Sequence, residues 1–204
     1  MIADAPAAGP RPGHSGLRAQ HKVRTRSAIR EAAMGLFARQ GYSHTTVDQI
    51  AQEAQVSHTT FFRYFASKEQ VVIADDLDEA REAAMAQLPR GIGHFELLRE
   101  LLVALYRIAA QDPWASNPER MRLIQSEPVL RIAHRLEAEA SISRAADYFA
   151  DYLEIDPDNP RLRVFLAATG GVMFHVADDS TPRDEHLLDR LMAAVDLLEQ
   201  GLPL

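Results

Sequence analysis

Four hydrogen-bonding side chains of small or medium size follow one another at the start of a short amphipathic run. They are Ser57, His58, Thr59 and Thr60, within the stretch "VSHTTFFRYF". Hydroxyl groups can bond to several base edges, a threonine methyl can contact that of thymine, and an imidazole can donate to a guanine acceptor. In a helix-turn-helix unit, residues at this place enter the major groove of DNA. We therefore expect base contacts here, with an idle surface histidine as the alternative for His58.

A second set of residues suits contacts with the sugar–phosphate backbone, which set register rather than sequence. Arg63, Tyr64 and Lys68 follow the polar run on its outward side. Thr45 and Thr46 open the preceding amphipathic run, where hydroxyls and backbone N–H groups can lie near a phosphate chain. Together these residues predict a surface that binds double-stranded DNA.

The aromatic residues of this stretch divide between core and surface. Phe61 and Phe65 lie four residues apart, the spacing of one helical face, and we expect both in the hydrophobic core. Phe62 falls on another face, where it could pack on a sugar or a thymine methyl. Whether Phe62 is a core residue or a DNA contact stays open.

Basic residues are concentrated near the start of the chain. Residues 1–70 carry nine Lys/Arg against five Asp/Glu, a net charge of +4. Residues 71–204 carry thirteen against twenty-four, a net charge of −11. This asymmetry indicates two modules with different partners. Lys22, Arg24 and Arg26 are candidates for phosphate or minor-groove contacts, although a solvated helix face would explain the same basic run.

Composition excludes several classes of protein. The chain of 204 residues is 47% apolar and 25% charged, which is typical of a soluble globular protein. Its first residues, "MIADAPAAGPRPGHSG", do not resemble a signal peptide, and no apolar run approaches the ~20 residues that span a bilayer. We expect a cytoplasmic location and no membrane partner.

The sequence also lacks the patterns of common catalytic and metal sites. It has no cysteine, no G-x-S-x-G and no phosphate-binding glycine loop. Its eight histidines never occur four residues apart. We therefore predict no catalytic residue, no metal site and no cofactor.

Apolar periodicity predicts an all-α protein. A first helix over 25–40 ends at Gly41, and a short helix follows from Thr46, whose pairing with Gln49 is typical of a capping box. Ser57 is the expected N-cap of a third helix through about Phe65. Further helices are expected over 67–88, 94–111, 118–126, 128–154, 161–178 and 183–201. For the last of these we expect Ser180 or Thr181 as the cap and Pro182 at the first helical position.

The first three helices resemble the DNA-binding domain of TetR-type transcriptional regulators. Members typically read T-V-x-x-I-A-x-x-A-G-V-S-x-x-T-L-Y-x-H/Y-F-x-S-K-E-x-L. The residues that match are Thr46, Val47, Ile50, Ala51, Ala54, Val56, Ser57, Thr60, Tyr64, Phe65, Ser67, Lys68 and Glu69. Gln55 replaces the usual glycine of the turn, so a non-glycine residue must adopt the left-handed conformation there. Phe61 and Phe62 replace the usual Leu-Tyr pair.

The resemblance implies a domain organisation. Residues 1–20 would be a disordered arm, 21–68 the helix-turn-helix domain that binds DNA, and 69–204 a helical domain for effector binding and dimerisation. It also implies a repressor that binds a palindromic operator as a homodimer through its last two helices. A small, largely apolar ligand would release it. "AATGG" (167–171) would allow the close backbone approach that tight helix contacts need, or would only weaken a buried helix.

An effector pocket is expected among the helices between 94 and 175. Apolar, aromatic and histidine side chains are its candidate lining residues, although ordinary helix cores contain the same stripes. They are Phe95, Leu98, Leu102, Tyr106, Trp114, Met121, Ile124, His134, Tyr148, Met173 and Phe174.

One further resemblance concerns the effector itself. "RLRVFLAATGG" and a set of nearby arginines are similar to TetR-type regulators that sense acyl-coenzyme A esters, where arginines meet phosphates. The arginines are Arg120, Arg122, Arg131 and Arg135. Solvated helix faces explain them equally well. Two alternatives to the ligand-responsive repressor stay open, a DNA-binding repressor or architectural protein without a ligand and, more remotely, an all-α enzyme.

Overall fold

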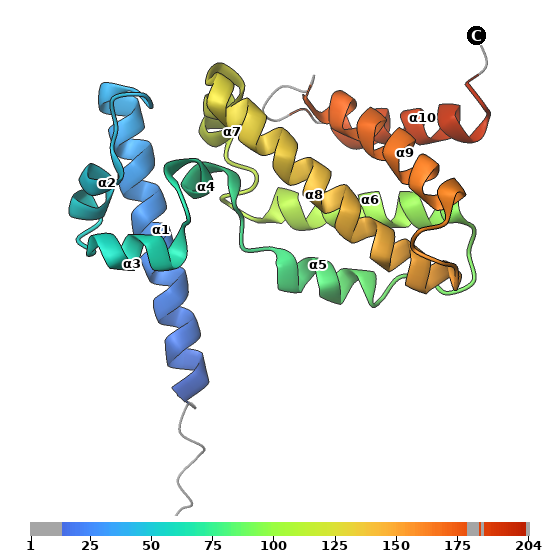
Figure 1. Ribbon diagram of the computed structural model, residues 1–204, viewed down its shortest axis with the longest axis horizontal. Helices are drawn as coiled ribbons and strands as arrows, with labels where there is room; N and C mark the ends of the chain where they lie inside the picture. Colours follow the sequence, from blue (N-terminus) through green and yellow to red (C-terminus); the bar gives the residue numbers. More distant parts are fainter. Residues whose placement is uncertain (1–13, 179–183, 185, 203–204) are drawn as a thin grey trace, which may run out of the picture. The chain divides into compact units, whose positions relative to one another are not determined.

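The computed structural model describes residues 14–178, 184 and 186–202 (Figure 1). All regular secondary structure in these ranges is helical, which confirms the predicted all-α class for this part of the chain. The helices are α1 (His14–Gln40), α2 (Val47–Glu53), α3 (His58–Tyr64), α4 (Lys68–Ile73), α5 (Asp78–Met85), α6 (His94–Gln111), α7 (Pro118–Ser126), α8 (Pro128–Leu153), α9 (Pro160–Asp178) and α10 (Leu187–Glu199).

The chain divides into two compact units, residues 1–71 and 72–204. The division falls within α4, three residues beyond the boundary expected from the sequence. Helix α1 extends back to His14, so residues 14–20, expected in a disordered arm, are helical. Leu17, Arg18, Ala19 and Gln20 are all good helix formers, which explains the extension. The expected caps at Ser180 and Thr181 and the expected first helical residue, Pro182, lie outside the described residues.

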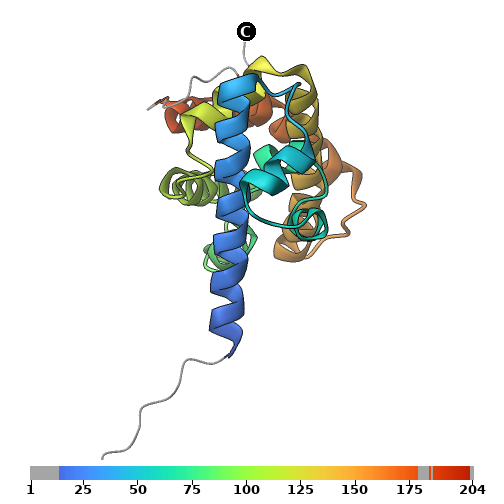
Figure 2. The same cartoon turned by 90° about the vertical axis from the view of Figure 1, so that its left-hand side faces the viewer.

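In the first unit, α2 and α3 lie beside α1 in both ribbon views (Figures 1 and 2). Thr46 forms the predicted capping box: its hydroxyl accepts from the Gln49 amide at 3.2 Å, and its own amide donates to the Gln49 side chain at 2.9 Å. Ser57 caps α3 by accepting from the Thr60 amide at 3.1 Å. Gln55, in the turn between α2 and α3, has a φ of 55°, which confirms the left-handed residue expected there.

Two arginines of α1 bind the end of α3 rather than solvent. The Arg26 Nη1 donates to the Tyr64 carbonyl at 2.7 Å, and its guanidinium lies 4.2 Å from the centre of the Phe65 ring. Arg30 is buried and lies 5.6 Å from the same ring. Phe61 and Phe65 are buried, as predicted. The position of α3 on α1 therefore depends on a cation at the carbonyl end of α3 as well as on apolar packing.

Lys68 is a second case of a cation bound to backbone carbonyls, where α4 meets the turn after α1. Its Nζ donates to the carbonyls of Tyr42 and Thr45, both at 2.8 Å, and lies 4.0 Å from the centre of the Tyr42 ring. The Tyr42 hydroxyl in turn donates to Glu69 at 2.7 Å. Burial opposes ionisation of Glu69, but hydrogen bonds from Tyr42, from Ser67 and from its own backbone, with the charge of Lys68, leave its pKa below the ordinary value.

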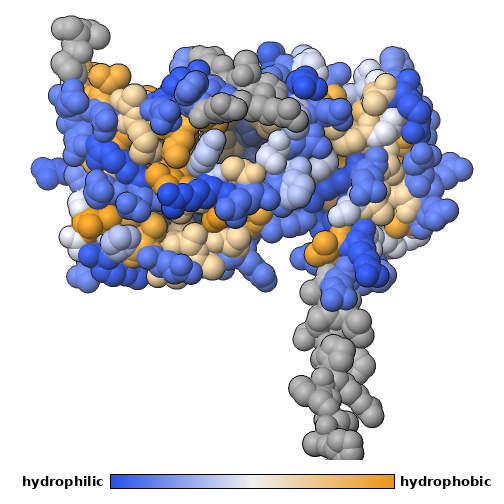
Figure 3. All heavy atoms as spheres, turned by 180° about the vertical axis from the view of Figure 1, so that it is seen from behind, coloured by the Kyte–Doolittle hydropathy of each residue, from blue (hydrophilic) through white to orange (hydrophobic). Residues whose placement is uncertain are grey.

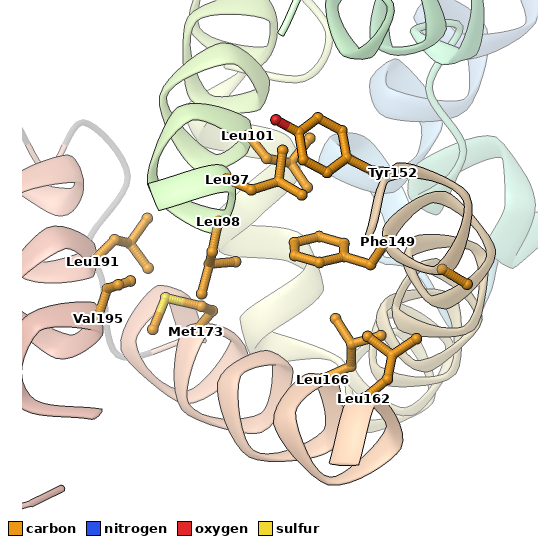
Figure 4. Close-up of a cluster of buried hydrophobic side chains, with 11 residues drawn as sticks. Leu97, Leu98, Leu101, Phe149, Tyr152, Leu162, Leu166, Met173, Leu191 and Val195 are labelled. Carbon is orange, nitrogen blue, oxygen red and sulfur yellow. The ribbon is translucent and has the colours of Figure 1, made fainter. Parts of the chain in front are cut away.

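The second unit is built around one apolar cluster contributed by α6, α8, α9 and α10. Phe149 of α8 is fully buried and points toward leucines of α6 and α9 (Figure 4). Leu191 and Val195 extend the cluster to α10. At the surface, Arg99 of α6 pairs with Asp196 at 2.7 Å and with Glu199, which joins α6 to α10.

The helix expected over 67–88 is interrupted between α4 and α5. Asp75 accepts from the Leu77 amide at 3.2 Å and pairs with Arg81 through both carboxylate oxygens, at 2.6 and 2.9 Å. An aspartate that bonds to a nearby amide competes with the helical hydrogen-bond ladder, which explains the break.

Helix α7 holds the end of α4 through a buried arginine. The Arg120 side chain donates from Nε to the Val72 carbonyl at 2.6 Å and from Nη2 to the Ile73 carbonyl at 2.8 Å. Its guanidinium lies 5.6 Å from the Trp114 ring, and the indole N–H donates to the Ala74 carbonyl at 3.0 Å. These donors satisfy carbonyl groups that a six-residue helix leaves without intrahelical partners.

We predict that Lys68→Ala lowers the free energy of unfolding of the first unit by ~1.5–3 kcal/mol, because two carbonyls lose a charged donor. Thermal and urea unfolding without DNA, followed by circular dichroism, would measure this. Lys22→Ala is the control, since Lys22 is exposed on α1. Equal stability of the two variants would contradict the structural role of Lys68.

We also predict that Arg120→Met destabilises the second unit by ~2–4 kcal/mol, because it leaves the Val72 and Ile73 carbonyls without their donor. The control is Arg122→Met, which removes an exposed arginine of the same helix. Urea unfolding monitored at the single tryptophan, which lies beside Arg120, would report the difference. An Arg120→Met variant as stable as the Arg122→Met control would contradict this role, because water would then satisfy the two carbonyls as well as the guanidinium does.

Candidate nucleic-acid interface and effector cavity

Helix α3 presents a small mixed surface to solvent. His58, Thr59, Phe62 and Arg63 are exposed, and Thr60 is half-buried. The His58 ring lies 4.7 Å from the Phe62 ring, and its Nε2 lies 3.6 Å from the Asp48 carboxylate of α2. The structure therefore brings hydrogen-bonding and aromatic groups together on the first two turns of α3.

Phe62 is 44% exposed although it is a large apolar residue. It makes an edge contact with the buried Phe61, with ring centroids 5.3 Å apart, and it also lies against the His58 ring. An exposed aromatic beside polar residues indicates a contact surface more than a core position. The structure thus answers the question that the sequence left open about its burial.

Several other residues predicted to contact DNA bond instead to groups within the first unit. Thr45 is 2% exposed, and its hydroxyl donates to the Gly41 carbonyl at 2.8 Å. Lys68 is half-buried, and its Nζ donates to the carbonyls of Tyr42 and Thr45. The Ser57 hydroxyl caps α3 and also bonds to that of Thr60 at 2.9 Å.

The remaining predicted contacts lie at or near the surface. Thr46 is exposed at the start of α2, and Lys22 and Arg24 are exposed on α1. Tyr64 is half-buried at the end of α3, where its ring lies 5.1 Å from the Arg63 guanidinium. Arg26, also considered a backbone contact, is the residue that binds the end of α3.

The second unit contains a cavity of about 390 Å³. Figure 3 shows a hollow in the face of the protein turned toward the viewer. Helices α6, α7, α8, α9 and α10 contribute the walls of the cavity. The lining residues are Tyr106, Ala109, Ala110, Ala115, Ser116, Pro118, Met121, Ile124, Gln125, His134, Phe174, Ala177, Asp178, Asp184 and Leu187.

Five of the eleven residues expected at a pocket line this cavity: Tyr106, Met121, Ile124, His134 and Phe174. The other six lie elsewhere. Leu98 and Met173 are buried in the apolar cluster, and Phe95, Leu102 and Tyr148 pack against it. Trp114, which precedes the lining residue Ala115, donates its indole N–H to the Ala74 carbonyl.

The small and polar members of the lining are not among the residues expected from the sequence, because that expectation covered only bulky apolar, aromatic and histidine side chains. Small residues leave the space that bulky ones fill. A usable signal was present: Tyr106, Ala109 and Ala110 follow the i, i+3, i+4 spacing of one face of α6.

Besides Tyr106, the described lining of the cavity holds three titratable side chains. Burial lowers the pKa of His134, and the charge of Arg120 adds to this effect against the opposing charges of Asp178 and Glu137, so the neutral imidazole is favoured. Asp184 accepts from Arg190 at 2.5 Å and from the His186 amide at 2.9 Å. Asp178 lies at the end of α9 and is exposed.

The four arginines considered as phosphate ligands do not belong to the described lining. Arg120 is bound to the end of α4, while Arg122 and Arg131 are exposed. Arg135 is exposed, lies 3.7 Å from Glu139 and stands 5.9 Å from the centre of the Phe174 ring.

Within 14–178, 184 and 186–202, no group of three or more His, Asp or Glu side chains is placed to hold a metal ion. In the same ranges no helix combines the length and apolarity needed to cross a membrane.

Two family models match the chain. Residues 29–74 match bacterial regulatory proteins of the tetR family, and residues 93–203 match the MftR C-terminal domain. The HTH-type transcriptional regulator TcmR of Streptomyces glaucescens is 33% identical over 172 residues, which covers 81% of this chain and 76% of that protein.

Solved structures agree with these matches. FadR of Thermus thermophilus, a TetR-family transcriptional repressor in complex with lauroyl-CoA, is 29% identical with a TM-score of 0.54, covering 88% of this chain and 95% of that one. The fatty acid degradation regulator FadR of Bacillus halodurans shares the fold at 20% identity, with a TM-score of 0.52 over 87% of this chain and 96% of that one.

These relatives are transcriptional regulators, and their similarity extends through both units. With a helix-turn-helix head matched in sequence and a helical second unit matched over nearly its whole length, the chain belongs to the TetR family of DNA-binding transcriptional regulators and is not an enzyme.

Proposed function

We propose that this chain is a repressor that binds a palindromic operator as a homodimer in the cytoplasm and leaves it when a small, largely apolar ligand binds. The observation that carries the proposal is a ligand-sized cavity in a chain that also presents an exposed reading helix. The cavity favours a ligand-responsive repressor over a ligand-independent one. The Thermus thermophilus relative, a repressor in complex with lauroyl-CoA, supports the same reading.

In the proposed complex the first turn of α3 enters the major groove. Thr59 and His58 would read base edges, and Phe62 would pack on a sugar or a thymine methyl. Arg63 would bind phosphate, assisted by Lys22 and Arg24 of α1 and by the start of α2 at Thr46. Because Lys68 and Thr45 already have internal partners, we assign them to holding this surface in shape.

Helices α9 and α10, which pack against each other, supply the proposed dimer interface. Val164 of α9 is 69% exposed and Leu197 of α10 is 49% exposed. Small exposed residues accompany them, including Ala167, Ala168, Gly171 and Ala193. An apolar face with small side chains permits close approach of a second copy, and a two-fold dimer would place two reading helices ~34–36 Å apart.

The two glycines of α9 have different environments. A Cβ on Gly170 would lie 2.5 Å from the Ile142 side chain of α8, so Gly170 serves packing within the chain. A Cβ on Gly171 would meet nothing within 4 Å. Gly171 can therefore be used to test the dimer without disturbing the protomer.

We expect Thr59→Ala to change base preference at one position of each half-site, because it removes a hydroxyl and a methyl from the reading surface. Arg63→Ala should weaken all sequences alike and lower the salt slope by ~1 per protomer. Operators selected from random oligonucleotides, followed by anisotropy titrations at several salt concentrations, would measure both effects. Unchanged selectivity and salt dependence in both variants would refute this DNA surface.

We expect Gly171→Glu to convert the dimer to a monomer that keeps its helical content, because two like charges would meet at the two-fold axis. Analytical ultracentrifugation and circular dichroism would measure the two properties. Gly171→Ala should remain dimeric, whereas Gly170→Ala should lower stability through the clash with Ile142. A Gly171→Glu protein that stays dimeric would place the interface elsewhere.

A further inference from the structure

Resting on the proposed function of the cavity as the effector site, we propose that its effector is an apolar molecule carrying a cationic nitrogen, rather than a fatty acid or an acyl-coenzyme A ester. The proposal follows from the side chains that the cavity offers to a ligand. The apolar walls of the cavity limit the size of the ligand, and its few polar groups determine which charge the ligand can carry.

Most of the lining offers contact without charge. Alanines and the side chains of Met121, Ile124 and Leu187 form apolar walls. Tyr106, Phe174 and His134 add aromatic rings, and the last two lie 5.9 Å apart. Aromatic faces attract cations through their quadrupole, most strongly where water is excluded.

The charged groups of the described lining are acidic. Asp178 and Asp184 are its only ionisable carboxylates, and no lysine or arginine belongs to the lining among residues 14–178, 184 and 186–202. Asp184 is already paired with Arg190. Asp178 forms no ion pair among the described residues, and it is the last residue of α9, where the helix dipole adds further negative potential.

The histidine of the lining does not compensate for this charge. The lowered pKa of His134 leaves its imidazole neutral near pH 7, so it can accept a hydrogen bond from an ammonium group. Two arginines are close to the lining but do not belong to its described residues. Arg120 donates to the carbonyls of α4, and Arg135 is exposed beside Glu139.

An acidic head group would therefore enter this cavity at a cost. A carboxylate loses its hydration on entry and meets the like charges of Asp178 and Asp184, while the described part of the lining offers it no lysine or arginine. A quaternary or protonated amine meets aromatic rings, a carboxylate and the end of a helix, all of which favour it. The cavity thus discriminates by head-group charge, while the apolar walls accept chains or rings alike.

Three probes with the same ten-carbon chain isolate the head group: decyltrimethylammonium, decanol and decanoate. Trp114 is the only tryptophan and adjoins Ala115 of the lining, so its fluorescence reports binding. We expect the cation to bind at least ~10-fold more tightly than decanoate, a difference of about 1.4 kcal/mol, with decanol between them. The preference should shrink as salt is added. Lauroyl-CoA, the ligand of the Thermus thermophilus relative, is the fourth probe and should bind no better than decanoate.

Asp178→Asn should reduce binding of the cation ~3–10-fold and leave that of decanol unchanged, because only the charged probe uses the carboxylate. Asp158→Asn is the matched control, since Asp158 is an exposed acid before α9 that does not line the cavity. Ala109→Phe, which adds a large ring at a half-buried position of the lining, should weaken all probes; a cation that still binds this variant occupies some other place and overturns the proposal.

The outcomes separate the inference from the function on which it rests. Equal or tighter binding of decanoate or lauroyl-CoA overturns the cationic effector but leaves an effector cavity in place. Binding of none of the probes overturns the cavity as an effector site and the inference with it. Operator release, measured by anisotropy with the same probes, should follow the same order as binding.

Discussion

Short helices leave carbonyl groups without intrahelical partners, and in this protein buried cations supply the missing donors. Helix α3 has seven residues and α4 has six, so a large share of their carbonyls lies in the last turn. Arg26 binds the end of α3, Arg120 binds the end of α4, and Lys68 binds the turn that follows α1. A charged donor to a carbonyl is worth more than a neutral one, and here each also rests near an aromatic ring.

This use of cations changes the meaning of the charge distribution. The first 70 residues have a net charge of +4, but Arg26, Arg30 and Lys68 are wholly or partly buried in contacts within their own unit. The basic groups left at the surface are fewer, with Lys22, Arg24 and Arg63 among them. Positive charge in the first unit therefore divides in two: one part fixes α3 on α1, and the smaller part left at the surface is the part available to the proposed DNA contact.

In the second unit the apolar cluster and the cavity are built from different side chains. Phe149 and its neighbours fill the centre of the unit, whereas the cavity forms where α6 and α9 carry alanines instead of larger side chains. Helix α7 belongs to both systems, since Met121 and Ile124 line the cavity while Arg120 holds α4.

The sequence by itself determined the all-α class, the caps at Thr46 and Ser57, the left-handed Gln55 and the burial of Phe61 and Phe65. These features are local or periodic, so a few neighbouring residues decide them. Only the tertiary structure decided which cations are internal and which residues surround the cavity. Each of those depends on groups tens of residues apart, as in the contact of Arg120 with Val72, and sequence spacing carries no record of such distances.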